Sequence, residues 1–383
     1  AVVQGGISGF DRVNVGVTFD GTAGSATGLL DVQTGSVIGT GSPQLLRVGT
    51  TGNEFSSGSA DGTAMVAGDV SGFLIGLIGS TGLRSSGNAT GDLTIGGTYS
   101  GGNGLQIATA GGAGIATGSA QVGAGVSDVS FVSVGGGGGD PDATGSSVGQ
   151  LAILAGGAQG TGGSFSNFSV GTTNGPATSL GTAVVQGGIS GFDRVNVGVT
   201  FDGTAGSATG LLTLLDGGIQ TGVLEVGSSN GTGSAQGTLD IGSNLVTVAD
   251  SMLLGGVATI ELDIDGFLRG TDFGAFDVGS AVLAGALEVM FSFTPSSGIF
   301  DLIVSEALNG IVGDFGSVSV LGLEPGTAYS AGIVTDQVGG MDVEIYRLTV
   351  GSEQPVPAPG TLFAMLAGLI SLAYGQSNSR RKA

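Results

Sequence analysis

Residues 89–96 read Ala-Thr-Gly-Asp-Leu-Thr-Ile-Gly, and residues 235–242 read Ala-Gln-Gly-Thr-Leu-Asp-Ile-Gly. In both segments a short Ala-x-Gly element leads into apolar residues that alternate with polar ones. This two-residue period is typical of a β-strand with one buried face. No part of residues 1–350 keeps the period of 3.6 residues that favours helices. The body of the chain is therefore predicted to be all-β.

The Ala-x-Gly element recurs along the chain, and apart from the longer interval between Ala116 and Ala208 adjacent cases lie 27 to 34 residues apart. Its alanines are Ala26, Ala60, Ala89, Ala116, Ala208 and Ala235. A repeat of this length, with glycine supplying the backbone angles of tight corners, favours coils that stack on one another. We therefore expect a parallel β-solenoid (β-helix) of roughly eight to ten coils, a rod about 40 to 50 Å long. The alternative is an irregular set of glycine-rich sandwiches, because the period varies by several residues.

One segment of 30 residues occurs twice without a change, as residues 1–30 and as residues 183–212. The copies diverge at Asp31 and Thr213. Such identity indicates either a recent duplication or an artefact of sequence assembly. In both cases the unit is modular, which suits an architecture in which each coil contacts only its neighbours.

The composition restricts the chemistry. With 82 glycines among 383 residues, 10% charged residues and 40% hydrophobic residues, the chain can still build a core. It has no Cys, His or Trp, which excludes disulfide frameworks, Cys/His zinc sites and catalysis by a histidine base. The formal net charge of −21 argues against nucleic acid and anionic membrane surfaces as partners. Cations and neutral glycans remain.

The texture of the sequence changes near Ser251. Residues 1–250 are glycine-rich repeats, whereas residues 251–350 contain longer strand patterns and more large apolar residues. Because the last coil of a solenoid exposes unpaired backbone groups, we expect residues 251–350 to form a C-terminal β cap. Residues 270–279 (Gly-Thr-Asp-Phe-Gly-Ala-Phe-Asp-Val-Gly) and the strand pattern at 284–289 resemble the C-terminal part of autotransporter-like β-helical passengers.

The C-terminal tail has the pattern of a membrane signal. Residues 351–360 form a proline-rich linker, and residues 362–374 carry no charge. A helix needs about 20 residues to cross a bilayer, so the apolar stretch spans only if it begins near Pro359. Three basic residues follow it: Arg380, Arg381 and Lys382. We expect one transmembrane helix with a basic tail in residues 361–383, its C-terminus in the cytoplasm and the body exported.

This tail resembles the PEP-CTERM sorting signal of Gram-negative bacteria, which combines a Pro-Glu-Pro motif, a short transmembrane helix and a basic end. The matching residues are Val356, Pro357, Ala358, Pro359, Arg380, Arg381 and Lys382. Ala358 stands where the family has glutamate, and residues 375–379 add a polar spacer. The resemblance implies an exosortase-type partner in the inner membrane, transient anchoring there, and release to the cell surface or extracellular matrix. A permanent tail anchor is the alternative.

The tail also bears on the other end of the chain. Export presupposes a translocated body, yet no secretory signal precedes Ala1. We therefore expect that the N-terminus is processed or truncated.

One acidic segment has a spacing that superficially matches a calcium loop: Glu261, Asp263, Asp265 and Asp272. An EF-hand loop needs a helix on each side, whereas residues 259–265 alternate like a strand with Ile260, Leu262 and Ile264 facing inward. We expect a solvated strand face here and no cofactor, with calcium as the less favoured interpretation.

Three classes of function remain. The leading one is a non-enzymatic surface or matrix protein, an adhesin or biofilm component that interacts with exopolysaccharide or other surface proteins. The second is a β-helical polysaccharide-degrading enzyme, which needs clustered carboxylates and basic residues, whereas the arginines of the body are scattered singly. The third is a calcium-dependent surface binding module.

Overall fold

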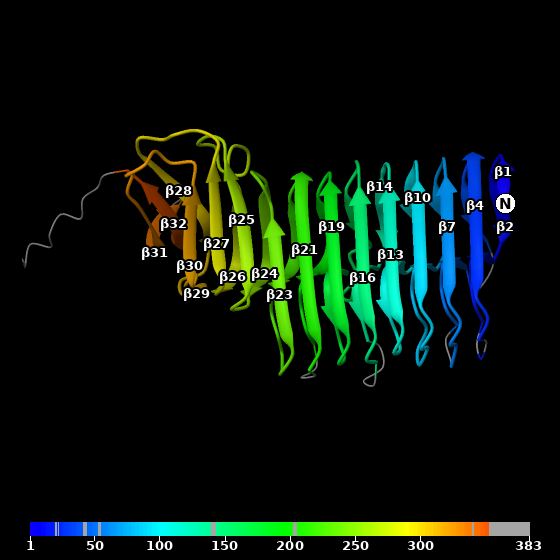
Figure 1. Cartoon of the computed structure of the whole chain (residues 1–383). Helices are drawn as coiled ribbons and strands as arrows, with labels where there is room; N and C mark the ends of the chain where they lie inside the picture. Colours follow the sequence, from blue (N-terminus) through cyan, green and yellow to red (C-terminus); the bar gives the residue numbers. More distant parts are fainter. Residues whose placement is uncertain are drawn as a thin grey trace, which may run out of the picture.

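The computed structural model describes residues 1–19, 21, 23–40, 44–52, 55–138, 143–201, 205–338 and 341–351. All regular elements in these residues are β-strands, and they wind into a parallel β-solenoid of about eleven turns (Figure 1). The predicted all-β solenoid is confirmed, and the alternative of separate sandwiches is wrong. No described segment forms a helix long and apolar enough to cross a membrane.

One long side of the solenoid is a sheet of twelve strands, called sheet A, in which each strand adds to the next along the axis. Burial alternates as the sequence pattern predicts: every second residue of β10, from Ala89 to Ile95, is buried. In spatial order the strands are β1 (Val2–Gln4), β4 (Ala26–Thr34), β7 (Ala60–Val66), β10 (Ala89–Ile95), β13 (Ile115–Val122), β16 (Ser146–Ile153), β19 (Thr178–Gln186), β21 (Ser207–Asp216), β23 (Ser234–Asp240), β25 (Ala258–Ile264), β27 (Ala286–Phe291) and β30 (Ser317–Leu321).

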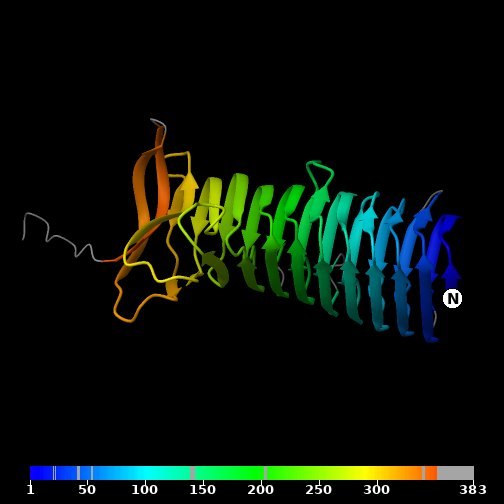
Figure 2. The same ribbon diagram turned by 90° about the horizontal axis from the view of Figure 1, so that it is seen from above.

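The other side is a sheet of twenty strands, called sheet B, and Figure 2 shows the two sheets as separate layers. The first six coils each give it two short strands, and the next four give it one long strand each. These strands are β2 (Ile7–Phe10), β3 (Arg12–Val15), β5 (Val37–Gly39), β6 (Leu45–Val48), β8 (Val70–Ser71), β9 (Ile75–Ile78), β11 (Thr98–Ser100), β12 (Gly104–Ala110), β14 (Gly125–Val129), β15 (Phe131–Gly137), β17 (Ala158–Gly160), β18 (Asn167–Thr173), β20 (Ile189–Val197), β22 (Ile219–Val226), β24 (Leu245–Leu254), β26 (Ala275–Leu283), β28 (Gly298–Ser305), β29 (Ile311–Gly313), β31 (Tyr329–Val338) and β32 (Met341–Val350).

Apolar side chains fill the interior as continuous ladders, because parallel strands in register stack equivalent residues above one another. A sheet B ladder consists of residues that are each at most 5% exposed: Val15, Val48, Ile78, Ile107, Val134, Val170, Val197, Val226 and Leu254. A buried sheet A ladder alternates large and small residues: Leu30, Ala64, Leu93, Ala120, Leu151, Ala183 and Leu212. Leu93 and Leu151 thus have alanines in the coils above and below, whereas Leu212 stacks on Leu239 in the next coil.

The two sheets touch at the glycine of the Ala-x-Gly element. A Cβ atom built on Gly91 in sheet A would lie 2.3 Å from the backbone nitrogen of Gly79, which follows β9 and has a φ of 58°. Neither position has room for a side chain, and the second also needs a left-handed backbone. The sequence pattern suggested that the glycine of the element lies at a corner of the coil. In the structure it lies at the contact between the two sheets. Ala108 occupies the position of Gly79 in the next coil, with a φ of 54°.

The two identical segments share the left-handed glycine that ends their sheet B strand. The φ angles of Gly16 and its counterpart Gly198 are 61° and 62°. Their surroundings differ, because residues 1–30 begin the first described coil whereas residues 183–212 lie between two others. Phe10 is accordingly 54% exposed, and its counterpart Phe192 is 2% exposed.

The parallel coils continue beyond residue 250. β25, β27 and β30 extend sheet A in parallel register as far as Leu321. The parallel coils therefore continue through the change of composition near Ser251. The strand pairing changes later, where β32 pairs antiparallel with β28 and β31. This hairpin lies at the end of the rod opposite the N-terminus (Figure 2).

Candidate functional site

The acidic residues singled out in the sequence lie on and just after β25. Ile260, Leu262 and Ile264 point into the core, and Glu261 and Asp263 alternate with them and face outward. This agrees with the expected strand face. Three carboxylates stack on neighbouring strands of sheet A, because Glu261 pairs in register with Asp240 on one side and with Glu288 on the other.

Stacked like charges and partial burial make ionisation of these carboxylates less favourable. Burial raises the pKa of Glu261, and the negative charges of Asp240, Glu288 and Asp263 raise it further. Burial likewise raises the pKa of Asp263, with Asp240 and Asp265 adding to the effect. The face is therefore electrostatically strained at neutral pH.

Asp265 and Asp272 hold a turn. The backbone N–H of Asp265 donates to the carbonyl oxygen of Asp272 at 2.6 Å, and the Asp272 carboxylate accepts a hydrogen bond from the Leu268 N–H at 3.1 Å. Within the described residues, no group of three or more acidic side chains is placed to hold a metal ion. Calcium binding here stays a prediction without a preformed ligand set.

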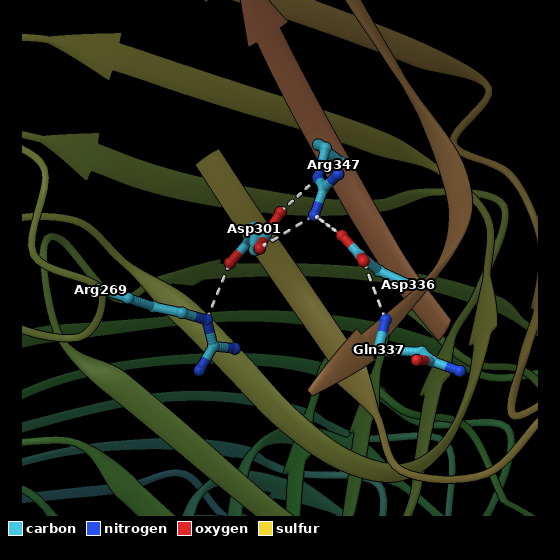
Figure 3. A network of polar contacts seen from close by, with 5 residues as sticks. All are labelled: Arg269, Asp301, Asp336, Gln337 and Arg347. Carbon is cyan, nitrogen blue, oxygen red and sulfur yellow. Dashed lines mark hydrogen bonds and ion pairs between the residues drawn. The ribbon is translucent and has the colours of Figure 1, made fainter. Parts of the chain in front are cut away.

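The arginines near the C-terminal hairpin form a structural junction (Figure 3). Arg347 on β32 donates to Asp301 on β28 at 2.6 Å and to Asp336 on β31 at 2.8 Å. Arg269 donates to the Asp301 carbonyl oxygen at 2.8 Å, and it pairs with Asp277 at 2.6 Å. The hydrogen bond from Arg347, together with one from the backbone N–H of Gln337, lowers the pKa of Asp336. The network joins the hairpin to the last coils.

A second polar surface, not predicted from the sequence, lies on the outer face of sheet B. Two adjoining hollows of about 240 and 370 Å³ form one groove, here called the sheet B groove. The smaller hollow lies over β6, β9 and β12, the larger over β12, β15, β18 and β20. A single ladder of paired residues follows its length: Arg47, Leu77, Gln106, Ser133, Ser169 and Asn196.

The groove contains polar atoms that are buried without a protein partner. They are Thr50 Oγ1, Thr109 Oγ1, Asn167 Oδ1 and Asn196 Oδ1. Asn196 is 2% exposed, and its amide nitrogen donates to Ser169 Oγ at 3.2 Å while its oxygen has no partner. An unsatisfied buried polar group costs about 1 to 3 kcal/mol, so such atoms call for solvent or a ligand.

Part of this surface was readable in the sequence. Runs such as Val195-Asn196-Val197 place a polar residue outward between buried valines. The depth of the groove was not readable, because it depends on Leu83 and Phe201, which follow the strands and line the hollows. The sequence does not show on which side such connecting residues lie.

The predicted sorting residues lie outside the described residues. They are Val356, Pro357, Ala358, Pro359, Arg380, Arg381 and Lys382, and with them lie the linker and the predicted transmembrane helix.

Comparison of the chain with protein-family models, with curated proteins and with solved structures finds no match in any of the three.

Proposed function

We propose that this chain is an exported, non-enzymatic protein of a bacterial surface or extracellular matrix that binds exopolysaccharide. The observation that carries this proposal is the sheet B groove, a polar surface that follows several coils of an elongated solenoid and has one charged lining residue, Arg47, at one end. Hydroxyl and amide side chains suit neutral sugars, which offer hydroxyl donors and acceptors in return.

The lining of the groove favours binding over cleavage. Glycoside hydrolysis generally uses a pair of carboxylates close to the sugar bond. Among the described residues that line the two hollows there is no Asp or Glu. Arg269 and Arg347 hold the C-terminal end together instead of facing a substrate. Release of reducing ends or unsaturated sugars from bacterial glycans would speak for an enzyme.

The C-terminal hairpin acts as the cap of the solenoid in this proposal. Tyr346 on β32 packs edge-on against Phe315, with ring centroids 5.1 Å apart, and donates a hydrogen bond to Asp314 at 3.0 Å. Together with the Arg347 network, these contacts cover part of the last coils. Capping of this kind limits edge-to-edge pairing between solenoids.

Delivery rests on the tail sequence. An exosortase-type enzyme reads Val356-Pro357-Ala358-Pro359, and the basic end keeps the C-terminus cytoplasmic until cleavage. Mass spectrometry of the protein recovered from the cell surface should find residues 361–383 missing. Recovery of peptides ending in Arg380-Arg381-Lys382 from that fraction would show a permanent anchor instead.

Binding is tested by sedimenting the purified full chain with insoluble neutral polysaccharides. Retention that soluble forms of the same polysaccharide abolish is the expected result. A chain that stays in the supernatant with every neutral polysaccharide would refute the proposed function.

A further inference from the structure

We propose that the sheet B groove binds one unbranched, neutral polysaccharide chain that runs parallel to the solenoid axis across successive coils. The inference rests on the proposed function and gives it a site, a ligand class and an orientation.

The sheet B groove is continuous. Its two hollows share the side chains of Gln106 and Thr109, so they form one surface. The ladder from Arg47 to Asn196 crosses six neighbouring strands. At about 4.8 Å between strands, this is a length of about 24 Å. A monosaccharide fills part of one hollow, whereas an extended chain contacts both.

The groove runs along the solenoid axis. Parallel strands repeat the same side-chain position at every coil, so a ligand along the axis meets similar groups at regular intervals. An extended hexose unit has a length similar to one interstrand spacing. Successive sugars can therefore lie over successive coils, which a ligand crossing the strands cannot match.

The lining of the groove offers hydrogen-bonding groups that suit sugar hydroxyls. The unpartnered oxygens of Thr50, Thr109, Asn167 and Asn196 accept hydrogen bonds, and the threonine hydroxyls also donate them. Sugar hydroxyls are donors and acceptors at once, so one ligand class supplies what all four positions lack. Such bonds replace an existing desolvation cost, which makes them more favourable than bonds to solvated groups.

Apolar groups complete the lining. Phe131 and Phe201 are half-buried in the larger hollow, and Leu77 and Leu83 line the smaller one. The C–H faces of sugar rings pack against such side chains. A groove with both apolar and uncharged polar groups fits a sugar polymer better than an extended peptide, whose backbone would need free strand edges.

Charge selects against acidic polysaccharides. The chain carries a net charge of −21, and the described lining offers Arg47 at one end as its positive side chain. A polyuronate would bring one negative charge per sugar into this field. The proposed ligand is therefore neutral.

The test measures affinity of the full chain by calorimetry for neutral linear oligosaccharides of increasing length, prepared from the polysaccharide that it retains. Affinity should rise with length until the oligomer spans both hollows. The variants Gln106→Ala and Asn196→Ala should each weaken binding of the long oligomers by about tenfold, the effect of losing one or two neutral hydrogen bonds.

Two matched controls separate the groove from the rest of the surface. Gln150 lies exposed on the outer face of sheet A, so Gln150→Ala should leave affinity unchanged. Asn14 is the counterpart of Asn196 in the identical segment and lies one strand beyond Arg47, outside both hollows, so Asn14→Ala should leave the affinity for oligomers no longer than the groove unchanged. Circular dichroism checks that all four variants keep the β-fold.

The possible outcomes are distinguishable. If neutral glycans bind but the groove variants bind as well as the controls, the groove proposal is overturned while the proposed function stands. If disaccharides bind as tightly as long oligomers, or a polyuronate binds more tightly than a neutral chain, the ligand class is wrong. If no neutral glycan binds at all, both proposals fail.

Discussion

The identical segments allow the same substitution to be made twice in the same local sequence. Phe192→Ala removes a ring that is 2% exposed and packs edge-on against Phe168, with ring centroids 5.7 Å apart. Truncating a buried phenylalanine costs about 3 to 5 kcal/mol, which includes the cavity and the lost ring pair. Phe10→Ala removes a ring that is already 54% exposed. It loses about half of a burial worth 1.5 to 3 kcal/mol and leaves no enclosed cavity, so we expect about 1 kcal/mol.

The difference between the two variants, about 2 kcal/mol or more, follows from coil stacking alone, because the flanking residues are the same. Urea unfolding followed by circular dichroism measures it, with the slope of the transition checked for a change in cooperativity. The first described coil can also unfold separately in a repeat structure, which would reduce the effect of Phe10→Ala on the main transition still further. Equal losses of stability in the two variants would refute the placement of residues 183–212 between two coils.

Three further predictions concern strain, pH and the hairpin. Ala108→Gly should raise the melting temperature, because it relieves the strain of an alanine with a left-handed backbone. Gly135→Ala at the equivalent position of the next coil should lower the melting temperature, since the new Cβ would lie 2.0 Å from a backbone oxygen. A lower melting temperature for Ala108→Gly than for Gly135→Ala would contradict the backbone path. Burial and like charges raise the pKa of Glu261, so its ionisation destabilises the folded state, and stability should fall as pH rises from about 4.5 towards neutrality. Glu261→Gln should raise the melting temperature at pH 7 and make stability less dependent on pH. A variant with the same pH profile as the unsubstituted protein would contradict the electrostatic strain inferred for this face. Asp336 has a lowered pKa, so its contribution to folding stability is present above pH 3.8 and is lost as pH falls through the lower folded-state pKa. Arg347→Met should remove this contribution and speed amide hydrogen exchange in the hairpin. Unchanged exchange would show that the ion pairs of Arg347 do not hold the hairpin in place.

Much of the coil path followed from local sequence, because strand burial depends on alternation that neighbouring residues reveal. The element at Ala89 stacks in register on those at Ala60 and Ala116. Two coils between Ala116 and Ala208 escaped the pattern, because Ser147 and Ser179 replace the alanine there. The glycine of the element is sterically required, since a Cβ there would lie against the backbone of the opposite sheet.

The prediction of a separate module from Ser251 did not fit the architecture for a related reason. Larger apolar residues suggested a separate module, yet Leu287 on β27 lies in the same inward ladder that holds Ala183 in an earlier coil. The pairing of strands is set by register and not by side-chain size. The sheet B groove also went unpredicted, because it depends on residues distant in sequence that connect one coil to the next.

Because leucine and alanine alternate in the sheet A ladder, consecutive coils differ at this inward position. Odd and even coils are not interchangeable from Leu30 to Leu212, since removing one coil would stack leucine on leucine or alanine on alanine. Removing or adding two adjacent coils preserves every large-to-small neighbour. The identical segments obey this rule, because β19 lies six strands after β1 in sheet A, an even number. Between Leu30 and Leu212 a duplication is therefore tolerated most easily in blocks of two coils, whereas after Leu212 the ladder continues with Leu239, Ile260 and Leu287 and imposes no such step.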